Sequence, residues 1–221
     1  MRRNVMWILA LVVACPNLAR AHDWDLSVVV RIYTSGAVLP ASPRALSVAT
    51  TILEDAGVHV TWISCELGRH ADAICDSLMG STDLRLRMIR CDDDSNSPFR
   101  ALGYALIDRQ QHSGALATVY VDRVTSLARE SGVDGSVLLG RALAHEIGHL
   151  LMGTNQHSRS GVMRARWTRR DLRRGRPDQW RFTRGEMMAM REHGVPLLMA
   201  SKSRTGQSDS NIGAMISKNQ Q

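Results

Sequence analysis

Three stretches in the first half of the chain have the apolar patterning of β-strands. Residues 26–33 are rich in β-branched side chains, while 58–63 and 84–89 alternate apolar with polar residues. Alternation of this kind is typical of a strand with one buried face. Between the first two stretches, Ala45 to Ala56 has apolar residues at helical spacing and is followed by Gly57, a suitable helix terminator. We therefore expect a strand, a helix and two further strands in this half.

The second half is predicted to be mostly helical after one hairpin. The apolar runs 102–107 and 117–121 flank the turn-rich link RQQHSG, which favours two antiparallel strands. Helices are then expected at the following places: 123–131, the apolar stretch after Gly135, 168–174, and a last segment from Thr183 to about Glu192. Thr183 followed by Glu186 is a capping-box pattern for that last helix. The order of elements predicts an α+β fold with a mixed sheet, one long apolar helix and a small, mostly helical C-terminal part.

The two ends of the chain are predicted to lie outside this domain. Residues 1–21 have a basic start, an apolar core and the small-residue site Ala19-Arg20-Ala21, which together are typical of a cleaved signal peptide. A lipid anchor at Cys15 is the less favoured alternative, since Val12-Val13-Ala14-Cys15 resembles a lipobox. The domain is expected at 22–200, and the polar segment 201–221 reads as a disordered tail. The signal-peptide pattern therefore predicts a secreted or periplasmic protein.

Composition and charge narrow the possible partners. The 221 residues are 44% hydrophobic and 22% charged, which is ordinary for one globular domain. No stretch after the signal peptide is expected to span a membrane. Removing 1–21 takes away three arginines and lowers the net charge from +7 to +4. Nine arginines lie between Arg164 and Arg184, which indicates either a solvated face or a contact for an anionic partner such as an envelope polymer. No nucleic-acid motif accompanies them, so no nucleic-acid partner is expected.

The cysteines agree with export. Cys65, Cys75 and Cys91 remain after signal cleavage, and an exported protein can keep a disulfide. The polar segment between Cys65 and Cys75 closes as a short loop, so this pair is the favoured bridge. Because the count is odd, Cys91 stays free or replaces one member of the pair.

The candidate chemistry lies in the long apolar helix, at His145-Glu146-Ile147-Gly148-His149. Residues four apart on a helix project from the same face, so His145 and His149 can bind one Zn²⁺ ion. Glu146 lies beside them, where a carboxylate can take a proton from a water activated by the metal. The motif predicts the centre of a zinc hydrolase.

A catalytic zinc site needs a third protein ligand. His157 is the favoured residue, because Gly153 can end the helix and turn the chain back. The alternative is a carboxylate from the last predicted helix, either Glu186 or Glu192. Met163 follows closely and can pack beneath the metal.

The run HEIGHLLMGTNQH followed by GVM resembles the metzincin metallopeptidases, whose pattern is an HExxH helix, a glycine turn, a third histidine and a Met-turn. The resemblance implies a zincin-like fold. It also implies His145, His149 and His157 as metal ligands, Glu146 as general base, Gly153 as the turn and Met163 in the Met-turn. The spacing here is HExxHxxxGxxxH, which is one residue longer in each gap than the usual pattern.

The sequence therefore predicts an exported zinc metallopeptidase that acts on a peptide or protein substrate. An edge strand, 102–107 or 117–121, is expected to pair with the extended substrate. Two alternatives stay open: a zinc amidase acting on a non-peptide envelope substrate, and a zinc-binding protein without catalysis. Glu146 argues against the latter, because a purely structural zinc site is closed by four ligands and has no use for a base.

Overall fold

The computed structural model describes residues 26–35, 41–67, 73–91, 101–108, 110 and 113–193. The predicted signal peptide 1–21, including Cys15, and the predicted tail 201–221 lie outside the described residues.

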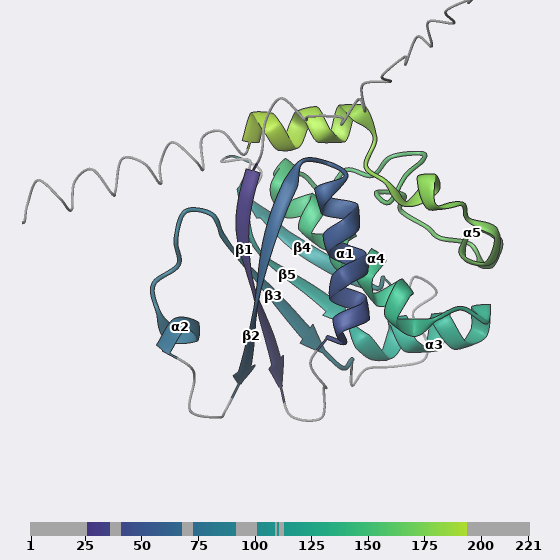
Figure 1. Ribbon diagram of the computed structural model, residues 1–221, viewed down its shortest axis with the longest axis horizontal. Helices are drawn as coiled ribbons and strands as arrows, with labels where there is room; N and C mark the ends of the chain where they lie inside the picture. The colour runs from purple at the N-terminus through teal and green to yellow at the C-terminus, as the bar shows by residue number, and fades with distance from the viewer. Residues whose placement is uncertain are drawn as a thin grey trace, which may run out of the picture.

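The centre of the molecule is a five-stranded mixed sheet in the order β2-β1-β3-β5-β4 (Figure 1). The strands are β1 Leu26–Ser35, β2 Val58–Leu67, β3 Asp83–Ile89, β4 Gly103–Asp108 and β5 Ser113–Tyr120. Neighbouring strands from β2 to β5 run parallel. β4 is antiparallel to β5, which confirms the predicted hairpin. β4, the first strand of this hairpin, forms one edge of the described sheet.

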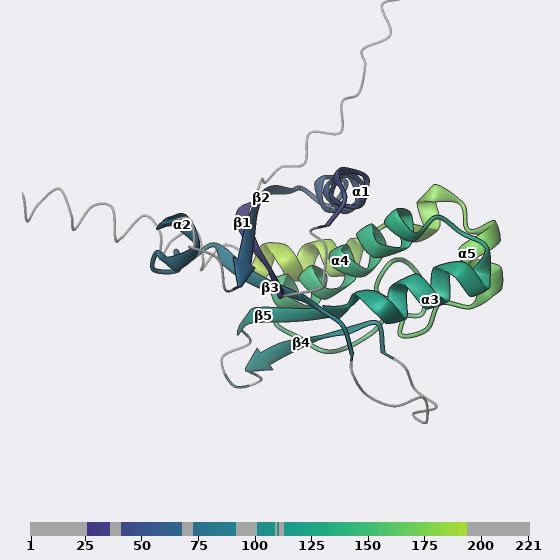
Figure 2. The ribbon, with the colours of Figure 1, turned by 90° about the horizontal axis from the view of Figure 1, so that it is seen from below.

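The helices follow the predicted order. They are α1 Pro43–Glu54, α2 Ala73–Asp76, α3 Val121–Ser131, α4 Gly135–Met152, α5 Arg169–Arg174 and the 3₁₀ turn η1 Pro177–Trp180. Residues 184–193 are also helical and form the yellow-green helix at the top of Figure 1. α1 and α4 pack against each other on one face of the sheet, and α4 lies over β5 and β4 (Figure 2).

The core explains why α4 is apolar on nearly every side. Alternate residues of β1, such as Val28, Val30 and Ile32, are buried against the helix layer. α4 itself is buried from Ala142 to Met152, because it lies between the sheet, α1 and the C-terminal part. A helix that is apolar all round is a buried helix, and the few polar residues that this one keeps therefore need a reason.

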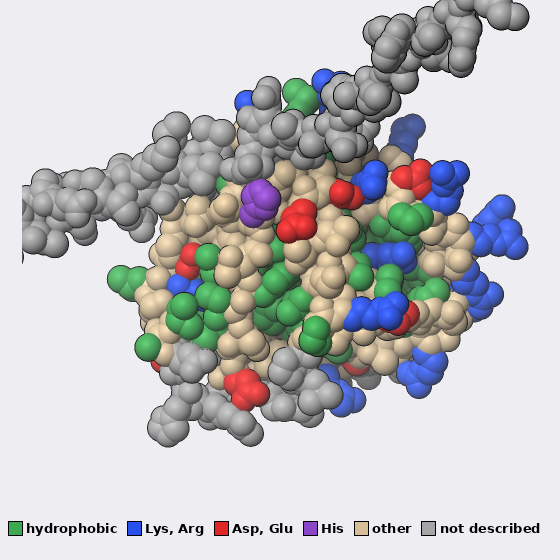
Figure 3. Space-filling model, in the orientation of Figure 1, with side chains coloured by type: hydrophobic (Ala, Val, Ile, Leu, Met, Phe, Trp, Pro, Cys, Tyr) green, Lys and Arg blue, Asp and Glu red, His purple; other side chains and the backbone are tan. Residues whose placement is uncertain are grey.

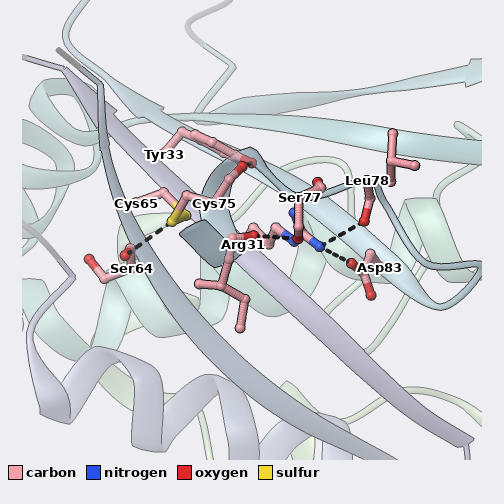
Figure 4. The surroundings of a disulfide bond; sticks show 9 residues. Arg31, Tyr33, Ser64, Cys65, Cys75, Ser77, Leu78 and Asp83 are labelled. Carbon is pink, nitrogen blue, oxygen red and sulfur yellow. Dashed lines mark hydrogen bonds and ion pairs between the residues drawn. A yellow bond between two sulfur atoms is a disulfide. The ribbon is translucent and has the colours of Figure 1, made fainter. Parts of the chain in front are cut away.

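The predicted disulfide is present. Cys65 at the end of β2 bonds to Cys75 in α2, with 5.8 Å between their Cα atoms (Figure 4). The Tyr33 hydroxyl donates to the Cys75 carbonyl at 3.2 Å, and the Arg31 guanidinium binds the Ser77 carbonyl at 2.8 Å (Figure 4). These contacts tie α2 to β1. Cys91 is not part of a disulfide.

The predicted α+β class is confirmed, with its mixed sheet, its long helix and its mostly helical C-terminal part. The short elements α2 and η1 were not predicted. Within the described residues, no helix is both long and apolar enough to cross a membrane.

Candidate metal centre

Three histidines from two neighbouring segments meet beside α4. His145 and His149 lie one turn apart on α4, and His157 comes from the loop that follows the helix. One possible ligand atom from each of the three lies within 4.8 Å of the others. His145 and His149 are buried, whereas His157 is exposed and closes the cluster on its solvent side. His157 is therefore the member of the cluster that is accessible to solvent.

Backbone carbonyls hold two of the rings with their Nε2 atoms facing each other. His145 Nδ1 lies 2.8 Å from the Val162 carbonyl oxygen, and His149 Nδ1 lies 2.8 Å from that of Thr154. A carbonyl oxygen can only accept, so each Nδ1 carries the hydrogen and each neutral ring has a bare lone pair at Nε2. The two Nε2 atoms are 3.2 Å apart. Two nitrogens bound to one tetrahedral zinc at about 2.0–2.1 Å lie roughly 3.4 Å apart, so this pair has the spacing of a cation site.

Burial keeps these rings neutral. Burial is the main cause that lowers the pKa of His145 to about 3 and that of His149 to about 4. It also lowers the pKa of His157. Metal binding requires the neutral imidazole, so the cluster needs no deprotonation to bind a cation at neutral pH.

Gly153 turns the chain so that His157 can return. It is the C-cap residue of α4, and its φ of 61° is in the left-handed region that glycine adopts without strain. The loop is then fixed at Ser158, whose N–H donates to the Met163 carbonyl at 2.9 Å. The Ser158 hydroxyl donates to the Glu186 carboxylate in a short hydrogen bond. The one-residue extension on each side of Gly153 is thus taken up without moving His157 away from the helix.

The segment around Met163 packs closely against α4. Met163 is fully buried, and a Cβ added to Gly148 would lie 2.8 Å from its sulfur and 2.6 Å from the Phe182 ring. Only glycine at 148 allows the Met163 segment to come this close to the helix. That close approach in turn places the Val162 carbonyl at His145.

The Glu146 carboxyl lies beside the first residue of the edge strand β4. Its carboxyl is buried, and its Oε2 atom has no hydrogen-bond partner among the described residues. Burial raises its pKa to about 8. A Cβ added to Gly103 at the start of β4 would lie 2.7 Å from Oε1 of Glu146. The carboxyl therefore occupies the space that Gly103 leaves at the edge strand.

The two carboxylates weighed as third ligands lie elsewhere. Glu186 accepts from the Thr183 N–H at 2.6 Å and from the Ser158 hydroxyl, so it caps its own helix and holds the loop after His157. Glu192 is exposed. Within the described part of the chain, the group of residues suited to hold a metal contains the three histidines and neither of these carboxylates.

The arginines between 164 and 184 do not form one uniform surface. Four of them pair with acidic residues, as Arg164–Asp171, Arg169–Glu130, Arg176–Asp178 and Arg181–Asp55. Four arginines of α5 line an open pocket of about 360 Å³. Figure 3 shows basic side chains gathered at the side of the molecule where α3 and α5 lie. The anionic partner itself stays a prediction from the sequence.

Two residues beside the centre were not predicted. The Trp167 ring meets His145 edge to face, with 5.6 Å between the ring centroids. Gly103 leaves the space for Glu146. Neither has a signal in the sequence pattern, since each acts through a residue distant along the chain.

The sequence matches no family model and no curated protein. Solved structures with a similar fold include the following two. The crystal structure of an archaemetzincin from Methanopyrus kandleri is 17% identical, with a TM-score of 0.49, and the match covers 76% of this chain and 95% of that one. A zinc-dependent peptidase from Methanocorpusculum labreanum is 15% identical, with a TM-score of 0.47, over 73% of this chain and 99% of that one. At these values no residue role is carried over from either protein.

Proposed function

We propose that this protein is an exported zinc metallopeptidase of metzincin-like architecture, with His145, His149 and His157 as its metal ligands. The observation that carries the proposal is the pair of buried Nε2 lone pairs held 3.2 Å apart by carbonyl acceptors at Nδ1. Two lone pairs at this distance repel each other unless a cation lies between them. A third imidazole beside them completes the ligand number of a catalytic zinc site and leaves one position open.

When bound there, a zinc ion would supply Lewis acidity that activates a water molecule and polarises a scissile carbonyl. The general base is Glu146, which accepts the proton of the attacking water at its carboxylate and passes it to the leaving amine nitrogen. Burial alone would keep this carboxyl protonated, since its pKa is about 8 without a metal. A bound cation alongside favours the ionised form, as a base requires.

The edge strand supports a peptide as the substrate. β4 has one side unpaired within the described sheet, and it begins beside the Glu146 carboxyl. An extended peptide that adds to such an edge is held by backbone hydrogen bonds along its length. That arrangement brings a scissile amide to the base, and it favours a peptide over the alternative of a non-peptide envelope amide.

The disulfide supports export. A bond between Cys65 and Cys75 persists in an oxidising compartment such as the periplasm or the extracellular space. This agrees with the signal peptide expected at 1–21.

The experiment is a peptide-library digestion by the zinc-loaded protein, with cleavage products identified by mass spectrometry. Wild type is expected to cleave, and Glu146→Gln to keep its zinc while losing about 10²- to 10⁴-fold in rate. The control is Glu192→Gln, an exposed carboxylate that should leave the rate unchanged. Zinc binding without cleavage of any peptide, but with release of amines from envelope polymers, would favour the amidase. Zinc binding with no hydrolysis of either substrate would favour the non-catalytic protein.

A further inference from the structure

Arg141 is a charged residue on the buried helix α4, and nothing in the site described above accounts for it. It lies four residues before His145, so it projects from the same side of the helix as the two histidines. Its guanidinium carbon lies 3.8 Å from the centroid of the Trp180 ring. Burial lowers the pKa of Arg141 to about 10, which still leaves the side chain charged at neutral pH.

Aromatic rings connect Arg141 to the histidine cluster. Trp180 meets Trp167 edge to face at 5.2 Å, and Trp167 meets His145 edge to face at 5.6 Å. The two tryptophans therefore form one wall that extends from the guanidinium to the candidate metal centre. Arg141 and His145 therefore lie at the two ends of one pair of packed rings.

This wall has hydrogen-bond donors in excess of acceptors. Among the described residues, no carboxylate lies within ion-pair distance of Arg141. The nearby Arg164 binds Asp171, yet its Nε and Nη2 atoms are buried without a partner, as is Nε1 of Trp167. Asp171 is already occupied by the hydroxyl and N–H of Thr168. No carboxylate of a described residue thus neutralises the positive charge of Arg141.

Such an arrangement is unfavourable for stability alone. The contact with the Trp180 ring stabilises the guanidinium cation. Against it stand the partial desolvation of the guanidinium and its repulsion from a metal cation held on the same helix face. An anionic group that binds against Arg141 would offset both costs.

We propose that Arg141 is a specificity-determining residue that binds the carboxylate of an acidic substrate side chain close to the scissile bond. This inference rests on the proposed peptidase function. A guanidinium matches a carboxylate with two parallel N–H···O bonds, which an amide or an apolar side chain cannot replace. The tryptophan wall excludes water on one side of the pair and so strengthens it.

The test uses two peptides that differ only by Glu or Gln at the position where library cleavage is most selective. Wild type is expected to cleave the Glu peptide with a kcat/KM about 10- to 100-fold higher, which is the usual range for a charged hydrogen-bonded pair. Arg141→Gln should lose this preference, so that its kcat/KM values for the two peptides become equal, whereas Arg141→Lys should retain part of it. Arg129→Gln is the matched control, because it removes one exposed arginine from α3 and should keep the wild-type ratio. Circular dichroism and zinc content establish that each variant is folded.

A binding measurement separates this inference from the peptidase proposal. Two peptide hydroxamates that carry Glu or Gln are titrated into each zinc-loaded protein, which requires no hydrolysis. Tighter binding of the Glu compound to wild type but not to Arg141→Gln supports Arg141 even when no peptide is cleaved, and only the peptidase proposal then fails. Equal binding of both compounds to wild type overturns the role of Arg141, whether or not peptides are cleaved. A preference that persists in Arg141→Gln also overturns it.

Discussion

Gly103→Ala tests whether the edge strand positions the base. The new Cβ would lie 2.7 Å from Oε1 of Glu146, about 0.7 Å inside the 3.4 Å at which ordinary van der Waals contact begins. It would also lie 2.4 Å from the Thr118 carbonyl oxygen, which is backbone of the neighbouring strand β5 and cannot rotate away. The start of β4 must therefore move by roughly 1 Å relative to β5, and the Glu146 carboxyl beside it is displaced as well; a shift of this size can cost about 100-fold in rate.

We expect Gly103→Ala to lose about 10- to 100-fold in kcat/KM and to keep its zinc, because Gly103 does not touch the histidine cluster. Overpacking of this kind also costs about 1–3 kcal/mol of stability. The assay compares peptide hydrolysis, zinc content and urea unfolding of the variant with those of wild type.

The matched control is Gly185→Ala, since a Cβ added at Gly185 meets no atom within 4 Å. It lies in helical residues 184–193, so alanine should raise the stability by up to about 1 kcal/mol and leave activity unchanged. A folded Gly103→Ala protein with wild-type kcat/KM would refute the placement of Glu146 against β4.

Three further results are expected. His157→Ala should weaken zinc affinity strongly while Glu192→Ala leaves it near wild type, as measured by competition with a chelating dye; equal affinities would remove His157 from the ligand set. Replacing Cys65 and Cys75 by alanine should lower the free energy of unfolding by about 2–3 kcal/mol for a loop of this length, and an unchanged urea midpoint would contradict a structural bridge. The free energy of unfolding of metal-free Glu146→Gln should fall as the pH drops below about 6.5. The two buried histidines of α4 have pKa values of about 3 and 4 in the folded protein, so between these values and 6.5 they bind protons only in the unfolded chain. A urea midpoint that stays constant between pH 7 and 5 would contradict their burial.

The sequence predicted the parts of this molecule that depend on local patterns. Strand alternation and helix spacing locate the main elements to within a few residues, because burial of one face imposes a period that can be read directly. Gly153 marks the end of α4 because the left-handed C-cap favours glycine. The capping box of Thr183 and Glu186 is present for the same kind of local reason.

What escaped prediction depends on contacts between distant segments. α2 has only four residues and is held by the Cys65 bridge and the Tyr33 hydroxyl rather than by its own pattern. The capping role of Glu186 was visible in the sequence, but its hydrogen bond to Ser158 beside His157 was not. Arg141 likewise reads as a stray charge on an apolar helix until Trp180 is placed against it. Such pairs have no periodicity, so only the folded chain reveals them.

The central claim is that the three histidines form a zinc site, and metal analysis of the purified protein tests it most directly. The protein is stripped with a chelator, dialysed against zinc and freed of loosely bound metal, and the metal is then measured by atomic absorption. We predict about one zinc per chain in wild type and none in the His145→Ala, His149→Ala double variant. Wild-type protein that is folded, yet retains no stoichiometric zinc after this treatment, would contradict the claim.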